Sequence, residues 1–420
     1  MGQTIAEKII SAHAGRPVQA GEVIVAPIDY CMGQDGTSMM IIDELENLGA
    51  ETIEAADRFA MVIDHSAPSP LRGVSNIHAK MRKAAKKYGC LLYEGGEGIC
   101  HQLLPEKGHV VPGDLIVGAD SHTCTYGALN AAATGVGSTD LAAAAYTGKL
   151  WFLVPESMKF IINNRLPFGS SAKDLILYLI GQVTADGATY CSAEYVGEAI
   201  SALSMDERFT ISNMAIEMGA KFGLMEADEK TLAWAAAHSA RPAKPQSADA
   251  DASYVEALEF DASQVGPQIA KPHRVDNVAP VEELEGLELQ EGVIGTCTNG
   301  RVVDFEIAAR ILGGKQVARD FRLICVPGSR RILLDIIASG AHQALVEAGA
   351  VFVTPGCGPC VGTHNGVPAD GEKVISTANR NFFGRMGNNQ DVEIYLGSPA
   401  TVAATALTGK LTDPRKVLGG

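Results

Sequence analysis

Two cysteines, Cys357 and Cys360, lie in the stretch "TPGCGPCVG" at a Cys-x-x-Cys spacing that suits a metal. Two thiolates are too few for tight binding, so further ligands are needed. A thioredoxin-like redox pair would open a helix, whereas a Pro-Gly turn precedes this motif and Gly362 follows it. A structural zinc site would need four protein ligands, and the chain has no second Cys-x-x-Cys.

A third reading of the motif adds Cys297, which lies in the loop "GTCTNGR" directly after an apolar run. Ordinary iron–sulfur clusters use four cysteines, whereas three would leave one iron of a 4Fe–4S cube open, as in a catalytic metal site. Cys325 lies inside the apolar run "LICVPG" and is interpreted as a small buried side chain. The remaining cysteines are also interpreted as packing residues: Cys31, Cys90, Cys100, Cys124 and Cys191.

The elements that must position these residues are short apolar runs that alternate with helical patterns. The expected strands are segments 59–64, 114–120, 292–296, 323–328, 351–356 and 373–377. Segments such as 74–89 and 304–314 are expected to be helices. This alternation predicts α/β architecture with largely parallel sheets.

Polar residues follow these predicted strands in five places, where open α/β sheets build their sites. The five sets are Asp64-His65, Asp120-Ser121-His122, Cys297, Cys357 with Cys360, and Asn379-Arg380. We therefore expect them to share one cleft. The Pro-, Ala-, Asp- and Ser-rich segment 239–285 is expected to be a connecting arm between domains.

The bulk composition excludes several classes of protein. The chain has 420 residues and a formal net charge of −15, which argues against binding to nucleic acid or anionic membranes. Its start lacks a signal-peptide pattern, and the longest apolar stretch, 141–155, is too short to cross a membrane. We expect a cytoplasmic protein with reduced cysteines. The glycine-containing segment 134–140 lacks the context of a dinucleotide site.

Seven motifs together closely resemble the aconitase superfamily, from about residue 5 to the C-terminus. They are "VIDH", "GGEGICHQ", "GADSHTCTYGA", "SNMAIEMGAK", "IGTCTNGR", "TPGCGPCVG" and "STANRNFFGRMG". The length resembles the separate large subunit of a two-subunit hydro-lyase of the 3-isopropylmalate dehydratase and homoaconitase type. The resemblance implies three α/β/α domains around a central cleft that holds an iron–sulfur cluster, without the swivelling fourth domain of the family.

The implied domains are residues 1–157, residues 158–278 with the connecting arm, and residues 279–420 with the cluster cysteines. The first domain would carry the site loops with Asp64, His65, His101, Asp120 and His122. The resemblance further implies that Cys297, Cys357 and Cys360 hold a 4Fe–4S cluster with one open iron.

The resemblance also implies the roles of the remaining site residues. His65, oriented by Asp64, would protonate the leaving hydroxyl. Hydrogen bonds to the iron-bound water and hydroxyl are implied for His101, Asp120 and His122. The implied residues near the substrate or cluster are Gln34, Ser121, Asn213, Glu217, Asn379, Arg380 and Arg385, of which Asn213 and Glu217 are expected on one helix face and Glu217 is counted as catalytic.

The guanidinium groups of Arg380 and Arg385 are of the type that pairs with substrate carboxylates. Gln34 stands where isopropylmalate-type subunits often carry His, which leaves the substrate open. Histidines without supporting context are expected to be solvated or packed: His78, His109, His238, His273 and His342.

The family's catalytic base is a serine on the fourth domain, so the resemblance implies a small partner subunit that supplies it. We expect the chain to bind the cluster alone and to be inactive without that partner. The implied reaction interconverts 2-isopropylmalate and 3-isopropylmalate for leucine synthesis. The alternatives are homocitrate/homoaconitate, citrate, citramalate or 2,3-dimethylmalate. A cluster-switched RNA-binding regulator is disfavoured by the acidic charge, and an electron carrier by the surrounding acid–base residues.

Overall fold

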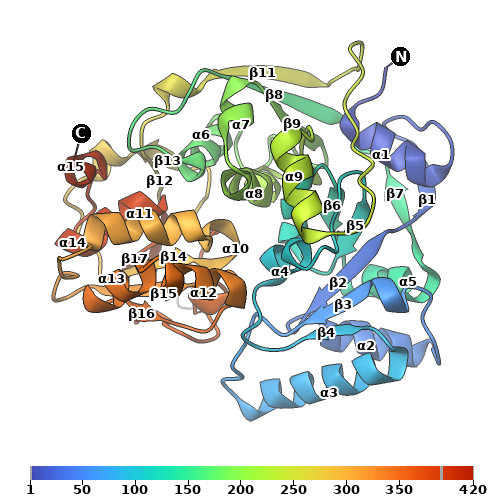
Figure 1. The fold of residues 1–420 in the computed structure, drawn as a ribbon, viewed down its shortest axis with the longest axis horizontal. Coiled ribbons are helices and arrows are strands. Elements are labelled where there is room, and N and C mark those ends of the chain that lie inside the picture. The colour runs from blue at the N-terminus through green and yellow to red at the C-terminus, as the bar shows by residue number, and fades with distance from the viewer. Residues whose placement is uncertain (1, 388–390, 420) are drawn as a thin grey trace. The chain divides into compact units, whose positions relative to one another are not determined.

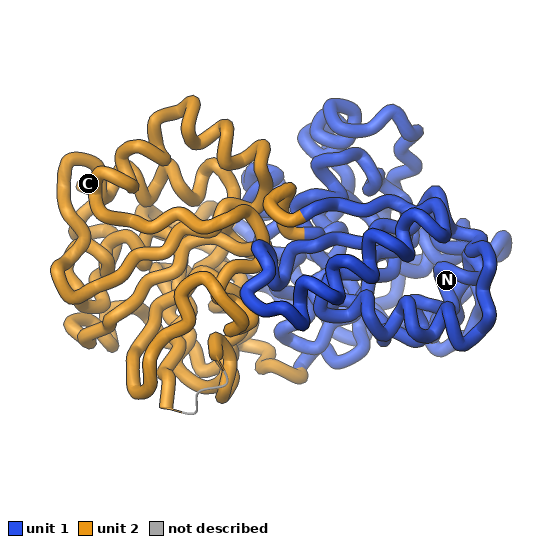
Figure 2. The backbone as a smooth tube through the Cα atoms, turned by 90° about the horizontal axis from the view of Figure 1, so that it is seen from below, with its two compact units in different colours: residues 1–94, 100–163, 187–260 blue, residues 95–99, 164–186, 261–420 orange. Residues whose placement is uncertain are grey.

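The computed structural model describes residues 2–387 and 391–419. Contacts between Cα atoms divide the chain into two compact units (Figure 2). Unit 1 comprises residues 1–94, 100–163 and 187–260, and unit 2 comprises residues 95–99, 164–186 and 261–420. The finer division into three domains stays a prediction.

Unit 1 contains a five-stranded, fully parallel sheet in the order β4-β3-β2-β5-β6 (Figure 1). The strands are β2 (Tyr30–Gln34), β3 (Phe59–Val62), β4 (Leu91–Tyr93), β5 (Leu115–Gly118) and β6 (Ala132–Gly135). The chain extends the sheet to one side through β3 and β4 and then returns to the other side of β2. The switch point of the topology therefore lies between β2 and β5.

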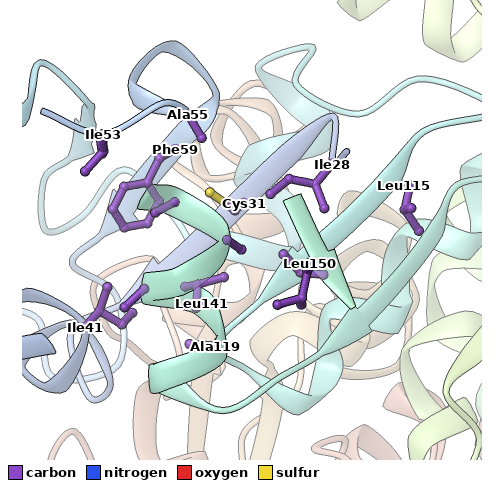
Figure 3. Close-up of a cluster of buried hydrophobic side chains, with 14 of the residues drawn as sticks. Ile28, Cys31, Ile41, Ile53, Ala55, Phe59, Leu115, Ala119, Leu141 and Leu150 are labelled. Atoms are coloured by element: carbon purple, nitrogen blue, oxygen red, sulfur yellow. The ribbon is translucent and has the colours of Figure 1, made fainter. Parts of the chain in front are cut away.

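The core of unit 1 explains why these strands read as continuous apolar runs. Every residue of β2, β3 and β5 is buried, as expected for a parallel sheet covered on both faces. Figure 3 shows Cys31 and Phe59 of the sheet beside Ile41 of α2 (Ser38–Asn47) and Leu141 of α5 (Ser138–Thr147). Burial of such side chains is the main driving force for this packing.

Unit 1 also holds a second sheet and a separate ribbon. The second sheet has the order β10-β9-β8-β11, and β8, β9 and β10 are mutually parallel. Its strands are β8 (Ser157–Asn163), β9 (Ser192–Val196), β10 (Phe222–Met225) and β11 (Glu256–Asp261). The ribbon pairs β1 (Val23–Pro27) with β7 (Lys149–Leu153) in antiparallel fashion.

Further helices of unit 1 are α1 (Ile5–Ala14), α3 (Arg72–Tyr88), α4 (Cys100–Glu106), α7 (Glu198–Ala202), α8 (Met205–Asn213) and α9 (Glu229–His238). The described part of unit 1 also contains the 3₁₀ segments η1 (Ala56–Arg58), η2 (Ser121–Leu129) and η3 (Met214–Met218).

Unit 2 is built on a seven-stranded sheet in the order β13-β12-β18-β17-β14-β15-β16. Five neighbouring strands, β18 to β16 in that order, are parallel, and β12 and β13 add antiparallel pairs at one edge. The parallel strands are β14 (Glu291–Gly295), β15 (Arg322–Val326), β16 (Val351–Phe352), β17 (Lys373–Ser376) and β18 (Glu393–Leu396). The switch point here lies between β14 and β17.

The helices of unit 2 are α6 (Ala172–Val183), α10 (Thr296–Asn299), α11 (Val302–Leu312), α12 (Arg330–Ala338), α13 (Ala341–Glu347), α14 (Pro399–Thr408) and α15 (Arg415–Leu418). Cys325 lies in the apolar core of this unit. Among the described residues, no helix is long and apolar enough to cross a membrane.

The structure confirms the α/β class and the six strands predicted from apolar runs, which are β3, β5, β14, β15, β16 and β17. It changes the interpretation of segment 239–285. That segment is more than a connecting arm, because it contains β11, β12 (Gln268–Ala270) and β13 (Val278–Pro280). These strands join sheet edges in both units.

Candidate active site

Predicted site residues lie at the carboxyl ends of parallel strands in two sheets, beside the switch point of each sheet. These are the five-stranded sheet of unit 1 and the seven-stranded sheet of unit 2. In unit 1, Gln34 ends β2 and Asp120 follows β5. In unit 2, Cys297 follows β14 and Asn379 follows β17. Ligands of open α/β sheets bind at such points, because the loops diverge there and leave a crevice.

His65 in unit 1 lies between two carboxylates. Its Nδ1 is 2.8 Å from Asp64 Oδ1, and its Nε2 is 3.3 Å from Asp120 Oδ2. Only 12% of the His65 side chain is exposed, and Asp64 is fully buried. The second oxygen of Asp64 accepts a 2.7 Å hydrogen bond from the backbone N–H of Cys100, so the carboxylate that orients the imidazole is itself held.

These carboxylates control the charge of the imidazole. Burial favours neutral His65, but the charges of Asp64 and Asp120 outweigh it and raise the pKa of His65 well above its usual value. Burial likewise favours neutral Asp120, but the neighbouring histidines, His101 foremost, lower the pKa of Asp120 well below its usual value. His65 can therefore act as a proton donor at neutral pH.

Asp120 is the centre of a histidine network. Its Oδ1 is 2.8 Å from His101 Nε2 and also accepts the backbone N–H of His122 at 2.9 Å. The Nε2 of His122 lies 2.8 Å from Glu217 Oε1. The Nδ1 of His101 is buried and has no hydrogen-bond partner within residues 2–387 and 391–419. The structure thus brings together all five predicted acid–base residues of the first domain and Glu217.

The predicted substrate residues of unit 1 lie beside this network. The Gln34 side chain is 3.5 Å from Asp120 Oδ2 and also accepts the Gly36 N–H, which fixes its amide. Ser121 is partly exposed and lines a cavity of about 440 Å³ together with Asp120 and Lys221.

The expectation that Asn213 and Glu217 share one helix face is wrong. The α-helix α8 ends at Asn213, and Glu217 lies in the following 3₁₀ segment η3. Both side chains nevertheless reach η2, since Asn213 donates to Thr125 Oγ1 at 2.8 Å and Glu217 meets His122. Asn213 is fully buried.

Three buried thiols converge in unit 2. The amide of Asn379 connects two of them, because its Nδ2 is 3.4 Å from Cys297 Sγ and its Oδ1 is 3.8 Å from Cys360 Sγ. A hydrogen bond with Cys360, then burial and the charges of Cys360 and Cys297, raise the pKa of the Cys357 thiol, so all three sulfurs interact. Cys297, Cys357 and Cys360 are each no more than 6% exposed.

This donor set fits a 4Fe–4S cluster that leaves one iron open. The sulfurs come from two separate loops, and the Asn379 amide lies against one sulfur of each loop, Cys297 and Cys360. Cysteine thiolates are the usual ligands of such clusters. The hydroxyl of Thr296, next to Cys297, is buried and makes no hydrogen bond within the described chain. A cation bound among these cysteines would stabilise their thiolate forms, which are the forms that ligate metals.

Arg385 lies at the thiols in this structure. Its Nη2 is 3.2 Å from Cys360 Sγ, and its guanidinium lies over the ring of Phe382 at 5.6 Å. Arg380 follows Asn379 directly and is half-buried. Their expected pairing with substrate carboxylates stays a prediction.

Sequence reasoning missed several residues that hold these loops. Arg301 is buried and donates to the backbone carbonyls of Cys297 and Thr298 at 3.2 and 2.9 Å. Asp35 and His78 form a hydrogen-bonded pair in unit 1 at 3.1 Å, so His78 has a specific partner. Asp35 could have been found by the same signal as Asp64, since Asp35 directly follows the buried strand β2 and Asp64 lies just beyond the buried strand β3.

Comparisons with known proteins show the family of this chain. The model of the family described as "Aconitase family (aconitate hydratase)" matches residues 7–409. A protein of Archaeoglobus fulgidus named 3-isopropylmalate dehydratase large subunit 2 is 50% identical over 419 residues, 100% of both chains. One of Methanopyrus kandleri, 3-isopropylmalate dehydratase large subunit 1, is 47% identical over the same share. A probable methanogen homoaconitase large subunit of Methanosarcina mazei is 49% identical over 94% of this chain and 100% of its own.

Among solved structures, Thermococcus kodakaraensis aconitase X in its holo-form matches with a TM-score of 0.53. The match covers 92% of this chain and 93% of that one, at 12% sequence identity. At this identity the likeness concerns the fold, which is aconitase-like.

Proposed function

Because the chain belongs to the aconitase family of hydro-lyases, we propose that it is the large subunit of a 3-isopropylmalate dehydratase. In this proposal it interconverts 2-isopropylmalate and 3-isopropylmalate by removal and re-addition of water. Full-length identities of 47% and 50% to relatives of that name support this substrate.

The second candidate is the large subunit of a homoaconitase, with the same chemistry on a longer tricarboxylate. It is favoured by the relative of that name at 49% identity. Gln34, fixed against Asp120, also keeps this candidate open.

The observation that carries the proposal is His65 held between Asp64 and Asp120. Hydroxide is a poor leaving group, so dehydration needs a proton donor at the oxygen. Asp64 holds Nδ1 through the shorter contact, and we assign the donated proton to Nε2, whose contact with Asp120 is longer. In the reverse direction the same nitrogen takes a proton from water.

Cys297, Cys357 and Cys360 would hold a 4Fe–4S cluster, with Asn379 positioned to hydrogen-bond two of their sulfurs. When bound, such a cluster supplies an iron with an open position that acts as a Lewis acid on the substrate hydroxyl and carboxylate. The network of Asp120 with its histidines would bind water and the departing hydroxyl.

Substrate carboxylates are assigned to Arg380 and Arg385, because guanidinium forks match carboxylates in two-point contacts. Four further side chains are assigned to contact the substrate or to hold the residues that do. They are the hydroxyl of Ser121, the amides of Gln34 and Asn213, and the carboxylate of Glu217.

A small partner subunit is assigned the remaining task, removal of the proton from the carbon next to a carboxylate. Support comes from the relatives' names, which call them large subunits.

The test is anaerobic purification of the chain with and without a candidate small subunit, followed by assay of each 2-hydroxy acid. We expect turnover of 2-isopropylmalate by the pair and none by the single chain. Turnover of homocitrate alone would establish the second candidate. Robust turnover by the single chain would overturn the role of the partner.

A further inference from the structure

We propose that Asp35 is a positioning residue for His65, because its carboxylate fixes the backbone turn that presents the imidazole. The proposal rests on the acid role of His65 in the proposed function. Asp35 is not a catalytic residue in this account, since it acts on His65 and Asp64 and not on substrate.

The carboxylate of Asp35 binds three consecutive backbone N–H groups. Its Oδ1 accepts from Asp64 at 3.2 Å and from His65 at 2.8 Å, and its Oδ2 accepts from Ser66 at 2.9 Å. Three such bonds from one side chain leave this turn little freedom to rotate.

A fourth contact comes from helix α3, where His78 Nε2 lies 3.1 Å from Asp35 Oδ2. The two oxygens then have two contacts each, which uses the four lone-pair directions of a carboxylate. Asp35 is 3% exposed. Its oxygens are therefore committed to the turn and to α3, and are not available as ligands for a metal or a substrate.

The topology explains how Asp35 reaches this turn. Strands β2 and β3 are parallel neighbours, with Gln34 opposite Val62. One residue beyond this pair, Asp35 leaves β2 at the level where β3 enters the Asp64-His65 turn. A short side chain spans the gap between adjacent strands.

The negative charge of Asp35 strengthens its hydrogen bonds to the turn. Burial opposes ionisation, but His78, His65 and the backbone N–H groups outweigh it and lower the pKa of Asp35 to about 2. The carboxylate is thus charged at any working pH, and hydrogen bonds to a charged acceptor are stronger than neutral ones. An Asn side chain would keep one acceptor oxygen and turn an NH₂ group toward the other donors.

His65 needs this support because Asp64 and Asp120 contact its imidazole ring, whereas Asp35 contacts its backbone. Asp64 belongs to the same turn, so a movement of the turn displaces both the imidazole and the carboxylate that orients it. A displacement of about 1 Å at a catalytic group can cost about 100-fold in rate.

The test compares Asp35→Asn with a matched control in the complete enzyme, reconstituted with its cluster and small subunit. We expect kcat to fall about 10- to 100-fold, with KM within about twofold and iron content unchanged. The control is Glu194→Gln, because Glu194 is also a buried carboxylate that accepts two backbone N–H groups, from Ile5 at 2.7 Å and Ala6 at 3.3 Å. It should lose stability without loss of kcat.

A second pair of variants covers the case in which Asp35→Asn does not fold. His78→Ala removes the contact to Oδ2, whereas His78→Gln keeps a donor amide. We expect His78→Ala to lower kcat several-fold and His78→Gln to restore most of it. Equal kcat in both variants would count against the proposal.

A readout independent of turnover is an NMR titration of His65 in the ¹⁵N-histidine-labelled chain. The His65 signal is identified by its absence in the variant His65→Gln. The imidazole contacts the carboxylates of Asp64 and Asp120, whereas Asp35 contacts the backbone of the turn. We expect Asp35→Asn to lower the pKa of His65 and change its tautomer balance. A folded Asp35→Asn protein with unchanged His65 titration and unchanged kcat overturns the proposal. If the wild-type enzyme turns over neither acid, the proposed function fails while the titration still decides the role of Asp35.

Discussion

The side-chain nitrogen of Lys173 lies 2.9 Å from the carbonyl oxygen of Thr377, 204 residues further along the chain. The same nitrogen is 2.6 Å from the carbonyl oxygen of Ala378, and Lys173 is fully buried. The next residue, Asn379, contacts the sulfurs of Cys297 and Cys360. A buried lysine on α6 therefore holds the turn that presents an amide to the thiols of unit 2.

Replacement of Lys173 by Met should destabilise this turn. Each buried carbonyl left without a donor costs about 1–3 kcal/mol, so we expect lower urea stability and faster loss of iron to a chelator. Lys230→Met is the control, because Lys230 also donates to three backbone carbonyls, of Ser201, Ala202 and Leu203, but in unit 1 at an exposed site. Iron retention by Lys173→Met equal to that of the control would show that Asn379 needs no such support.

Serine in place of Cys297, Cys357 or Cys360 should abolish tight binding of the cluster, since three thiolates are the full protein ligand set proposed here. Iron content and visible absorbance after anaerobic reconstitution measure this. Cys325→Ala is the matched control, because Cys325 is a fully buried cysteine of the same unit that packs in the apolar core. It should keep its iron, and loss of iron in this variant would mean that the assignment of ligands is incomplete.

The dehydration rate should fall as pH rises through the pKa of His65, because the imidazolium is the acid form. That pKa is raised by Asp64 and Asp120 against the effect of burial, so the alkaline limb should lie above the usual range of histidine. Asp64→Asn removes one of these charges and should move the limb of the kcat profile to lower pH, with a fall of about 10²- to 10⁴-fold in kcat. A limb that stays in place would assign the proton donor elsewhere.

Stability should fall with rising pH because of a buried carboxyl group in unit 1. Burial raises the pKa of Glu194 to about 7, from 4.5 in the unfolded chain, despite hydrogen bonds from Tyr254 and two N–H groups. Between these values the folded state binds more protons than the unfolded state, so stability decreases from about pH 4.5 to about pH 7, by on the order of 3 kcal/mol. Urea denaturation across this range should show a smaller decrease in Glu194→Gln. Glu22→Gln, at an exposed site, should behave as the wild type.

Elements with a strong one-dimensional signal could be predicted from the sequence. Strands such as β3 and β5 are buried on both faces and read as continuous apolar runs, and polar residues at their ends mark the site. The edge strands β11 and β13 carry a weaker signal because they are partly exposed, and β12 is buried but has only 3 residues. This is why β11, β12 and β13 were expected to be an arm.

The path of the chain from α8 into η3 shows a second feature that the sequence could not predict. A spacing of four residues predicts a shared face on an α-helix, but Asn213 ends the helix and Glu217 follows on 3₁₀ geometry. Both side chains reach partners in η2 from these two different elements, which the spacing of four residues could not indicate.

By itself, the sequence determined the chemical inventory of this protein: three cysteines in two loops, a carboxylate–histidine pair, and the motifs of one family. Only the tertiary structure decided which histidines and carboxylates contact one another. His65 meets Asp120, and His78 meets Asp35, across tens of residues of chain. The physical reason is that hydrogen bonds and charge interactions act over a few ångströms, and burial sets their strength. Neither distance nor burial is a property of sequence spacing.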